Sequence, residues 1–319
     1  MAAANPLRTK RMEGIRRKRR KARLAIWQNY ELYLFLLPTL VYFLVFHYMP
    51  MYGVQIAFKR FIAVKGINGS PWVGFEHFER FFESFQFLIV LKNTLAISLY
   101  ELLVAFPAPI VLALLLNQLT SERFKKLAQT VTYAPHFISV VVVVGMLYLF
   151  LSPKIGLVNR LLVSLGFEPV YFMASSAWFS TIFVFSGIWQ NIGWSTIIYL
   201  AALAGVNPDL HEAAVMDGAT KRQRIQHIDF PSILPTIMIL LILNIGHLMS
   251  VGFEKVYLMQ NQLNIDASEV IQTYVYKAGL LEGQLSYSAA IGLFNSVINF
   301  TLLLAFNQLA RKSKQASLW

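Results

Sequence analysis

The sequence predicts an all-α membrane protein that crosses the bilayer several times. Three observations predict this class. Hydrophobic residues make up 56% of the chain and charged residues only 14%, whereas soluble globular proteins have about 45–50% and 25%. Long apolar runs recur along the chain, and about 20 mainly apolar residues suffice for a helix to cross a bilayer. The absence of cysteine excludes a disulfide framework and thiolate chemistry.

Six of the apolar runs are long enough to be transmembrane helices. They lie at residues 31–48, 88–116, 131–151, 178–204, 232–250 and 288–308. The first run follows a basic region, as a secretory signal does, but no small-residue cleavage site follows it. We therefore expect a basic arm at 1–30, a six-helix membrane domain at 31–310 with a polar loop at 205–231, and a tail at 311–319.

The distribution of Lys and Arg predicts the orientation. Ten of the 28 lie within Arg8–Arg23, ahead of the first span. The arm, the tail and the loops 117–130 and 205–231 together hold 19, and the three loops of the other side hold 8. The positive-inside rule then places both termini and the loop 205–231 in the cytoplasm. Basic arms can bind nucleic acid, but one placed directly before a span is typical of a topology signal and an anionic-lipid anchor, so no nucleic-acid partner is expected.

The loop between the first two spans contains an amphipathic pattern. Phe75, Phe78, Phe82 and Phe85 recur at helical spacing among charged residues. We expect a helix at the outer surface with this aromatic stripe on one face. The stripe either packs against the helix bundle or forms part of a docking face for an extracytoplasmic partner.

The second span contains two prolines and an acid. Pro107 and Pro109 lack backbone donors and should kink or interrupt the helix. An ionised carboxylate at mid-membrane costs about 2.5–3.5 kcal/mol on insertion scales, so Glu101 should face protein or water rather than lipid. It serves either in helix packing or in a solute pathway.

Polar residues on three later spans allow the same two interpretations. With Glu101, the candidate pathway residues are Gln190, Asn191, Trp194, Asn244, His247, Asn295 and Asn299. The spacings 244/247 and 295/299 place each pair on one helical face. Interhelical hydrogen bonds worth about 0.6–2 kcal/mol explain any one of them. A lining for a hydroxyl-rich solute explains the whole set.

The loop 205–231 has the signals of two short helices at an angle. Asn207-Pro208-Asp209 is a strong helix start, because Asn can cap, Pro fits the first turn and Asp favours the positive end of the helix dipole. Gly218 suits a left-handed cap that ends this helix, and a second helical stretch covers 219–226. Alanines beside the glycine corner offer small surfaces for close approach, which favours a helix-in-groove contact with a soluble partner.

The spacing within this loop resembles a family motif. Glu212-Ala213-Ala214 is followed after three residues by Gly218. Nine residues separate Gly218 from Ile228, and one residue separates Ile228 from Phe230-Pro231. This is similar to the cytoplasmic loop of permease subunits of ATP-binding cassette importers, which reads Glu-Ala-Ala, three residues, Gly, nine residues, Ile, one residue, Leu-Pro. Here phenylalanine replaces the leucine.

Further segments resemble the carbohydrate-importing branch, most closely the permeases for complex or acidic oligosaccharides. They are Gly74-Phe75-Glu76-His77-Phe78, Asn93-Thr94 and Trp189 to Trp194. The resemblance implies the type I importer fold, with residues 208–226 as a coupling helix seated in a cytoplasmic ATPase. It assigns the coupling role to Glu212, Ala213, Ala214, Asp217, Gly218 and Ala219.

The same resemblance implies the partners and the location. They are a second permease, with a related chain favoured over a homodimer, two ATPase subunits that use ATP and Mg, an extracytoplasmic solute-binding protein, and an oligosaccharide. The location would be a bacterial cytoplasmic membrane, with the chain in contact with its lipids.

No catalytic motif or cofactor site is found in this chain. No Gly-Lys dipeptide is present, so a phosphate-binding P-loop is excluded. His211-Glu212 lacks the second histidine of a zinc-protease motif, because Val215 occupies its position. Two alternatives remain: an ion-coupled secondary transporter, although no internal repeat is evident, and a membrane-embedded transferase.

Overall fold

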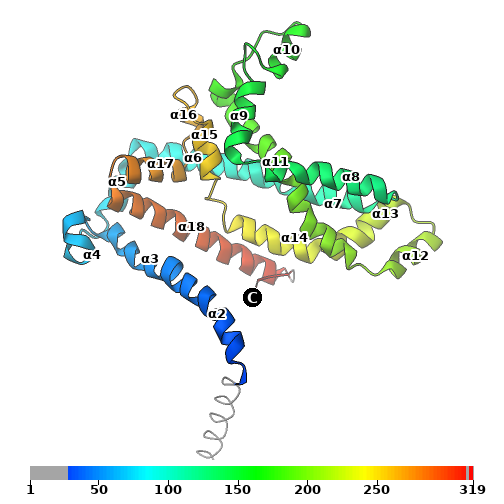
Figure 1. The fold of residues 1–319 in the computed structure, drawn as a ribbon, viewed down its shortest axis with the longest axis horizontal. Coiled ribbons are helices and arrows are strands. Elements are labelled where there is room, and N and C mark those ends of the chain that lie inside the picture. The colour runs from blue at the N-terminus through cyan, green and yellow to red at the C-terminus, as the bar shows by residue number, and fades with distance from the viewer. Residues whose placement is uncertain (1–27, 314–315, 319) are drawn as a thin grey trace, which may run out of the picture. The chain divides into compact units, whose positions relative to one another are not determined.

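The computed structural model describes residues 28–313 and 316–318, and this part of the chain is almost entirely helical (Figure 1). The described residues contain no β-strand, only an isolated antiparallel bridge between Lys59 and Trp72. The all-α prediction is therefore confirmed. The basic segment Arg8–Arg23 lies outside the described residues. The chain divides into two compact units, one ending at Gln55 and one beginning at Ile56.

The first unit is dominated by one apolar helix. Helix α2 (Tyr30–Phe43) continues through a π-turn (Leu44–Tyr48) and α3 (Met49–Met51) into a 3-10 segment (Tyr52–Phe58). Together they form a helical segment of 29 residues, Tyr30–Phe58. It contains the predicted first span and continues beyond its predicted end at residue 48.

The second unit contains the remaining helices. The longer ones are α6 (Phe85–Tyr100), α7 (Pro107–Asn117), α8 (Glu122–Tyr133), α9 (Val140–Phe150), α11 (Ser176–Ala204), α14 (Phe230–Ile245) and α18 (Leu285–Lys312). The shorter ones are α4 (Gly66–Gly69), α5 (Glu76–Glu83), α10 (Leu157–Ser164), α12 (Pro208–Met216), α13 (Lys221–Arg224), α15 (Phe253–Met259), α16 (Ile265–Ser268) and α17 (Ile271–Tyr276).

Four helical segments of the described chain are long and apolar enough to cross a membrane: Tyr30–Phe58, Phe85–Asn117, Lys221–Ile245 and Leu285–Lys312. The number becomes five if a bent pair, Glu122–Phe137 and Val140–Phe150, is one span. Helix α11 covers the predicted fourth span in 29 residues, about 43 Å of helix, but its Ser, Gln, Asn and Trp residues make it less apolar. Length and composition therefore support four or five of the six predicted spans.

The predicted third span, 131–151, is not one straight helix. Helix α8 ends in a 3-10 turn (Ala134–Phe137), and α9 starts at Val140 after a bend of 99°. Pro135 cannot donate a backbone hydrogen bond, and the extended Ser139 caps the new helix by accepting from the N–H of Val142.

The two prolines of the second span change the helix without ending it. Helices α6 and α7 are joined by a π-turn at Glu101–Ala105, in which the N–H of Phe106 donates to the carbonyl of Glu101, 3.2 Å away. A π-turn is a common way to fit an interruption into a continuous helix. The expected distortion therefore occurs just before Pro107, and the segment Phe85–Asn117 remains one span of 33 residues.

The amphipathic helix α5 exists, but its buried residues, His77 and Phe81, are not in the predicted stripe. Phe81 is only 1% exposed, whereas Phe82 is 47% and Phe85 84% exposed. The helix begins at Glu76 and ends where Ser84 adopts an extended conformation, so Phe75 and Phe85 lie outside it. The ring of Phe81 packs against an aromatic cluster of Phe87, Tyr274, Tyr287 and Phe294. The contact attaches α5 to α18 and α17.

Three helices, α7, α11 and α14, pack together at the end where the loop 205–231 connects α11 to α14. Ile110 and Ala113 of α7, Tyr199 and Leu203 of α11, and Ile233 and Ile237 of α14 form one buried apolar cluster. Figure 1 shows α12 and α13 at this end of the second unit and α5 at the opposite end. The polar loop and the amphipathic helix thus lie at opposite ends of the helices.

We predict that Phe81→Ala destabilises the protein by about 3–5 kcal/mol, because it removes a fully buried aromatic ring and leaves a cavity. Thermal unfolding in detergent, followed by circular dichroism, measures the effect. Phe85→Ala removes the same ring from an exposed position and is the control. Equal losses in the two variants would contradict the assignment of Phe81 as the packing residue.

Candidate functional site

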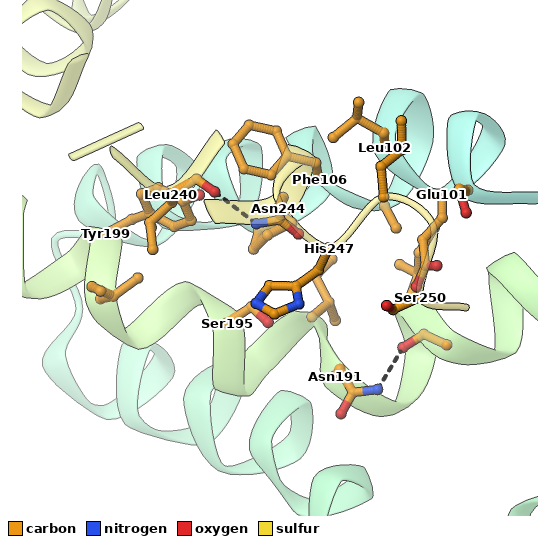
Figure 2. A pocket seen from close by; sticks show the side chains of 18 residues that line it. Glu101, Leu102, Phe106, Asn191, Ser195, Tyr199, Leu240, Asn244, His247 and Ser250 are labelled. Carbon is orange, nitrogen blue, oxygen red and sulfur yellow. Dashed lines mark hydrogen bonds between the residues drawn. The ribbon is translucent and has the colours of Figure 1, made fainter. Parts of the chain in front are cut away.

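A polar cavity lies between the second span, α11 and the end of α14. Its volume is about 440 Å³, within the range of ligand pockets, which is about 300–1,000 Å³. Figure 2 shows side chains of all three segments converging on it. Its polar lining consists of Ser98, Glu101, Asn191, Ser195, Tyr199, Asn244, His247 and Ser250, and its apolar lining includes Phe106, Leu240 and Leu248.

Four of the predicted pathway residues meet at this cavity: Glu101, Asn191, Asn244 and His247. The Asn244 amide donates to the carbonyl of Leu240, 2.8 Å away, and the Asn191 amide donates to that of Gly187, 3.2 Å away (Figure 2). Each acceptor lies one turn earlier in the same helix. These two donations therefore do not join separate helices, and both amides remain in the cavity wall.

Gln190 and Trp194 instead hold the break between α8 and α9. Gln190 is 6% exposed, and its amide donates to the carbonyl of Ile138, which the break frees, over 2.8 Å. The ring of Trp194 stacks on His136 with centroids 4.5 Å apart and an angle of 5°. Nδ1 of His136 in turn lies 3.0 Å from Oδ1 of Asn191. One short segment of α11 thus supports the break and lines the cavity.

The two predicted asparagines of α18, Asn295 and Asn299, lie at two different sites, both outside the polar cavity. The Asn299 side chain accepts from the N–H of Met249 over 2.9 Å and donates to Oγ of Ser250 over 3.0 Å. It therefore fixes the chain just after α14. Asn295 lies in a second cavity, of about 400 Å³, together with Gln272. The buried carbonyl oxygens of both side chains have no hydrogen-bond donor among the described residues.

A second feature is the helical corner at α12. Asn207 caps α12 by accepting from the N–H of Asp209 over 3.0 Å, and Pro208 is its first residue. Gly218 ends the helix with φ +77°, where a side chain would be strained, and the N–H of Ala219 donates to the carbonyl of Ala214 over 2.9 Å. This is a Schellman cap. The predicted start and the predicted glycine end are confirmed.

Helix α13 then starts at an angle with its own cap. Thr220 and Gln223 form a capping box, in which each side chain accepts from the backbone N–H of the other. The corner leaves apolar side chains of α12 uncovered within the second unit: Met216 is 86% exposed and Leu210 51%. Glu212, Ala213, Asp217 and Gly218 are exposed too. A capped helix that exposes apolar and small residues is suited to enter the groove of a partner.

Comparison with known proteins identifies the family from this loop and the helices around it. The family model described as "binding-protein-dependent transport system inner membrane component" matches residues 105–315. The chain belongs to this family. It is thus an inner-membrane permease component of bacterial import systems, and the family prediction made from the loop motif is confirmed.

The permease is similar over nearly its whole length to curated proteins of Bacillus subtilis (strain 168). It is 45% identical over 295 residues to the polygalacturonan/rhamnogalacturonan transport system permease protein YteP. The alignment covers 92% of each chain. It is also 45% identical over 295 residues to protein LplB, covering 92% of this chain and 93% of that one.

A solved structure confirms the fold. In a bacterial ABC transporter that imports the acidic polysaccharide alginate, one chain matches the permease with a TM-score of 0.85 at 41% identity. The match covers 92% of this chain and 99% of that one. The same transporter has been solved with an alginate pentasaccharide-bound periplasmic protein, again with a TM-score of 0.85. The importer permease fold expected from the sequence is therefore present.

Sequence reasoning missed part of the cavity of the permease. Ser98, Ser195 and Ser250 line it, but serine is common in membrane helices and gave no signal. Lys255, on the short helix α15, donates to the carbonyl of Phe183 over 2.9 Å. Burial lowers the pKa of Lys255 to about 8, and the Glu101 carboxylate opposes this shift. Its place in a loop of the sequence concealed that it reaches the cavity wall.

In the residues that the structure describes, no group of three or more His, Asp or Glu is placed to hold a metal ion. Glu101 lies in the cavity wall and the ammonium of Lys255 lies behind Gly187, while Ser, Asn, Tyr and His side chains make up the rest of the polar lining. Such a lining can bind and release a hydroxyl-rich solute by hydrogen bonds.

We predict that Asn299→Ala lowers the stability of the permease by about 1–3 kcal/mol, because the buried N–H of Met249 loses its acceptor. Asn244→Ala serves as the control, since the described bond of Asn244 is to its own helix. Thermal unfolding in detergent measures both. A larger loss for Asn244→Ala would contradict the assignment of Asn299 to packing.

Proposed function

We propose that this permease forms the pathway by which an ATP-driven importer carries an acidic oligosaccharide into the bacterial cytoplasm. The observation that carries the proposal is α12: a capped helix at one end of the bundle, with exposed apolar residues, in a chain of the importer permease family. The polar cavity between α7, α11 and α14 supplies the route for the solute.

The coupling role falls to the loop motif. Glu212, Ala213, Ala214, Asp217, Gly218 and Ala219 form or flank the corner at the end of α12. Small residues allow close approach to a groove, Glu212 and Asp217 supply charges to pair across it, and Gly218 sets the angle to α13. Closure of the ATPase would displace α12, and the helices joined to it would convert this into inward- and outward-facing states.

The proposal requires several partners. They are a second, related permease, two cytoplasmic ATPase subunits and an extracytoplasmic solute-binding protein. ATP and Mg are used by the ATPase subunits, so this chain is not itself an enzyme. The positive-inside rule supports cytoplasmic termini and a cytoplasmic α12. The position of α5 at the opposite end is consistent with an outward face there (Figure 1).

The substrate class is inferred from the relatives and from the cavity. One relative at 45% identity is named for polygalacturonan and rhamnogalacturonan transport, and the neighbour at 41% identity imports alginate. Polygalacturonan, rhamnogalacturonan and alginate are all polysaccharides that contain uronic acids. Amide, hydroxyl and imidazole groups of the lining suit sugar hydroxyls, and the ammonium of Lys255 offsets the negative charge of Glu101. We therefore propose an oligosaccharide of uronates.

For the coupling loop, we predict that Glu212→Lys and Gly218→Val each insert normally but lower ATPase association and transport-coupled ATP hydrolysis. A β-branched residue at a positive φ costs about 1–3 kcal/mol, which favours another corner geometry. Co-purification and ATP hydrolysis with substrate-loaded binding protein measure both effects. Glu122→Lys makes the same charge change at an exposed position of α8, outside the loop, and is the control. Normal transport by both motif variants would refute the coupling role.

For the pathway, we predict that Asn191→Ala and Asn244→Ala lower uronate-oligosaccharide transport by about 2- to 10-fold, the effect of one lost hydrogen bond. Association with the ATPase should not change, since neither residue lies near α12. Gln190→Ala and Asn299→Ala should instead lower thermal stability. Uptake into proteoliposomes measures transport, and unchanged dependence on solute in both cavity variants would assign these residues to packing.

A further inference from the structure

A buried carboxylate next to the coupling loop has no role in the function proposed above. The Asp229 side chain is 0% exposed. It ends the π-turn Ile225–Asp229 within the continuous helical segment Lys221–Ile245, so it does not stand at a helix start that a side chain would cap. Burial of a carboxylate is costly unless it is hydrogen-bonded or paired. Its partners therefore indicate why it is there.

The partners of Asp229 come from two other elements. Oδ2 accepts from Nε2 of Gln118 over 2.8 Å, and Oδ1 accepts more weakly from Nδ2 of Asn117 over 3.4 Å. Oδ1 also lies 3.3 Å from Nε2 of His211. Asn117 and Gln118 end α7, and His211 belongs to α12, directly before the motif residue Glu212. One carboxylate thus joins the ends of α7, α12 and α14.

This carboxylate lies at the end of the helices that surround the cavity. Ala113 of α7, Leu203 of α11 and Ile233 of α14 belong to one buried apolar cluster, so these helices are already packed together. Helix α12 is not part of that cluster. Asp229 supplies a polar contact of α12 with α7 and α14, in addition to the covalent links 205–207 to α11 and 217–220 to α13.

We propose that Asp229 is the positioning residue that transmits displacement of α12 to α7 and α14, with Gln118 and His211 as its partners. The inference rests on the proposed coupling function and adds a named linkage within this chain. Because Asp229 is fully buried, it acts through its neighbours and not by contact with the ATPase.

The first test uses the assembled transporter in proteoliposomes, with its binding protein and a uronate oligosaccharide. In Asp229→Asn, which keeps the shape of the side chain, the ATPase remains bound but transport per ATP falls by about fivefold, the scale expected for loss of a coupling contact. Glu122→Gln removes a carboxylate charge from an exposed position of α8, outside the coupling loop, and keeps transport per ATP at the wild-type value. Unchanged transport per ATP in Asp229→Asn would overturn the inference.

The second test separates coupling from folding by rescue. Gln118→Glu sets a second carboxylate against Asp229, and two close carboxylates repel each other. This variant also loses transport per ATP. The double variant Gln118→Glu with Asp229→Asn restores a carboxylate-amide pair and recovers at least half of the loss. A double variant as impaired as the worse single variant would contradict the paired role.

The third test observes the linkage directly. The chain has no cysteine, so Leu115→Cys on α7 and Asp209→Cys in the first turn of α12 accept two spin labels without background. Both positions are exposed in this chain, and Asp209 belongs neither to the motif nor to the exposed apolar residues of α12; co-purification checks that the labelled chain binds the ATPase as the unlabelled chain does. The distance between the labels stays constant through the ATP cycle in the otherwise wild-type transporter, and it changes or broadens with ATP in Asp229→Asn. A constant distance in both backgrounds would overturn the inference.

These outcomes are distinguishable from failure of the proposed function. If Glu212→Lys and Gly218→Val transport normally, the coupling role of α12 is wrong. If those two variants fail and the Asp229 variants retain normal transport per ATP, the coupling role remains and only the linkage through Asp229 is wrong.

Discussion

The rest of the structure depends on backbone hydrogen bonding in a medium without water. Within lipid every N–H and carbonyl needs a protein partner, so a helix can be interrupted only where other groups supply one. Two interruptions occur in the helices near the cavity, and one of them lines it. The π-turn Glu101–Ala105 places Glu101 in its wall, and the break after Phe137 frees the carbonyl of Ile138, which Gln190 binds. Polar side chains on α11 therefore serve the backbone at one position and line the cavity at its neighbour: Gln190 binds the freed carbonyl, and Asn191 lies in the cavity wall.

The segment from Gln190 to Trp194 shows how one stretch of helix serves two surfaces. A Cβ on Gly193 would lie 2.2 Å from the carbonyl oxygen of Thr132, so only glycine permits the close approach of α8. Gln190 and Trp194 then hold the turn that follows α8, whereas Asn191, beside them in sequence, also lines the cavity. Any change in the angle between α8 and α9 would therefore also act on the wall of the cavity. Packing and pathway are not alternatives for this segment, although they are for its individual residues.

Features set by local chemistry could be predicted from the sequence. The cap at Asn207 and the positive φ of Gly218 involve groups within a few residues, so they define α12 without knowledge of the fold.

Features set by distant contacts could not be predicted from the sequence. Phe81 and Phe82 are equally apolar, and only the position of α18 decides which ring is buried. Likewise, Asn244 and Asn299 have the same side chain, yet one lines the cavity and the other binds the backbone after α14. The sequence identified the polar residues of the spans, and only the tertiary structure shows which of them line the cavity and which bind the backbone elsewhere.

The two kinds of contact near the coupling loop have different mechanical properties. The apolar cluster of α7, α11 and α14 is held by burial, which is non-directional and permits small sliding of one helix past another. The contacts of Asp229 depend on distance and angle, so they resist sliding at the ends of the same helices.

A transporter that alternates between two states needs both properties, contacts that permit sliding and contacts that resist it. Its helices must shift along the pathway, and the element that receives the force must not slip relative to them. The buried carboxylate lies at the point where α12 meets two of the helices that line the cavity, which is where slip would be most costly to coupling.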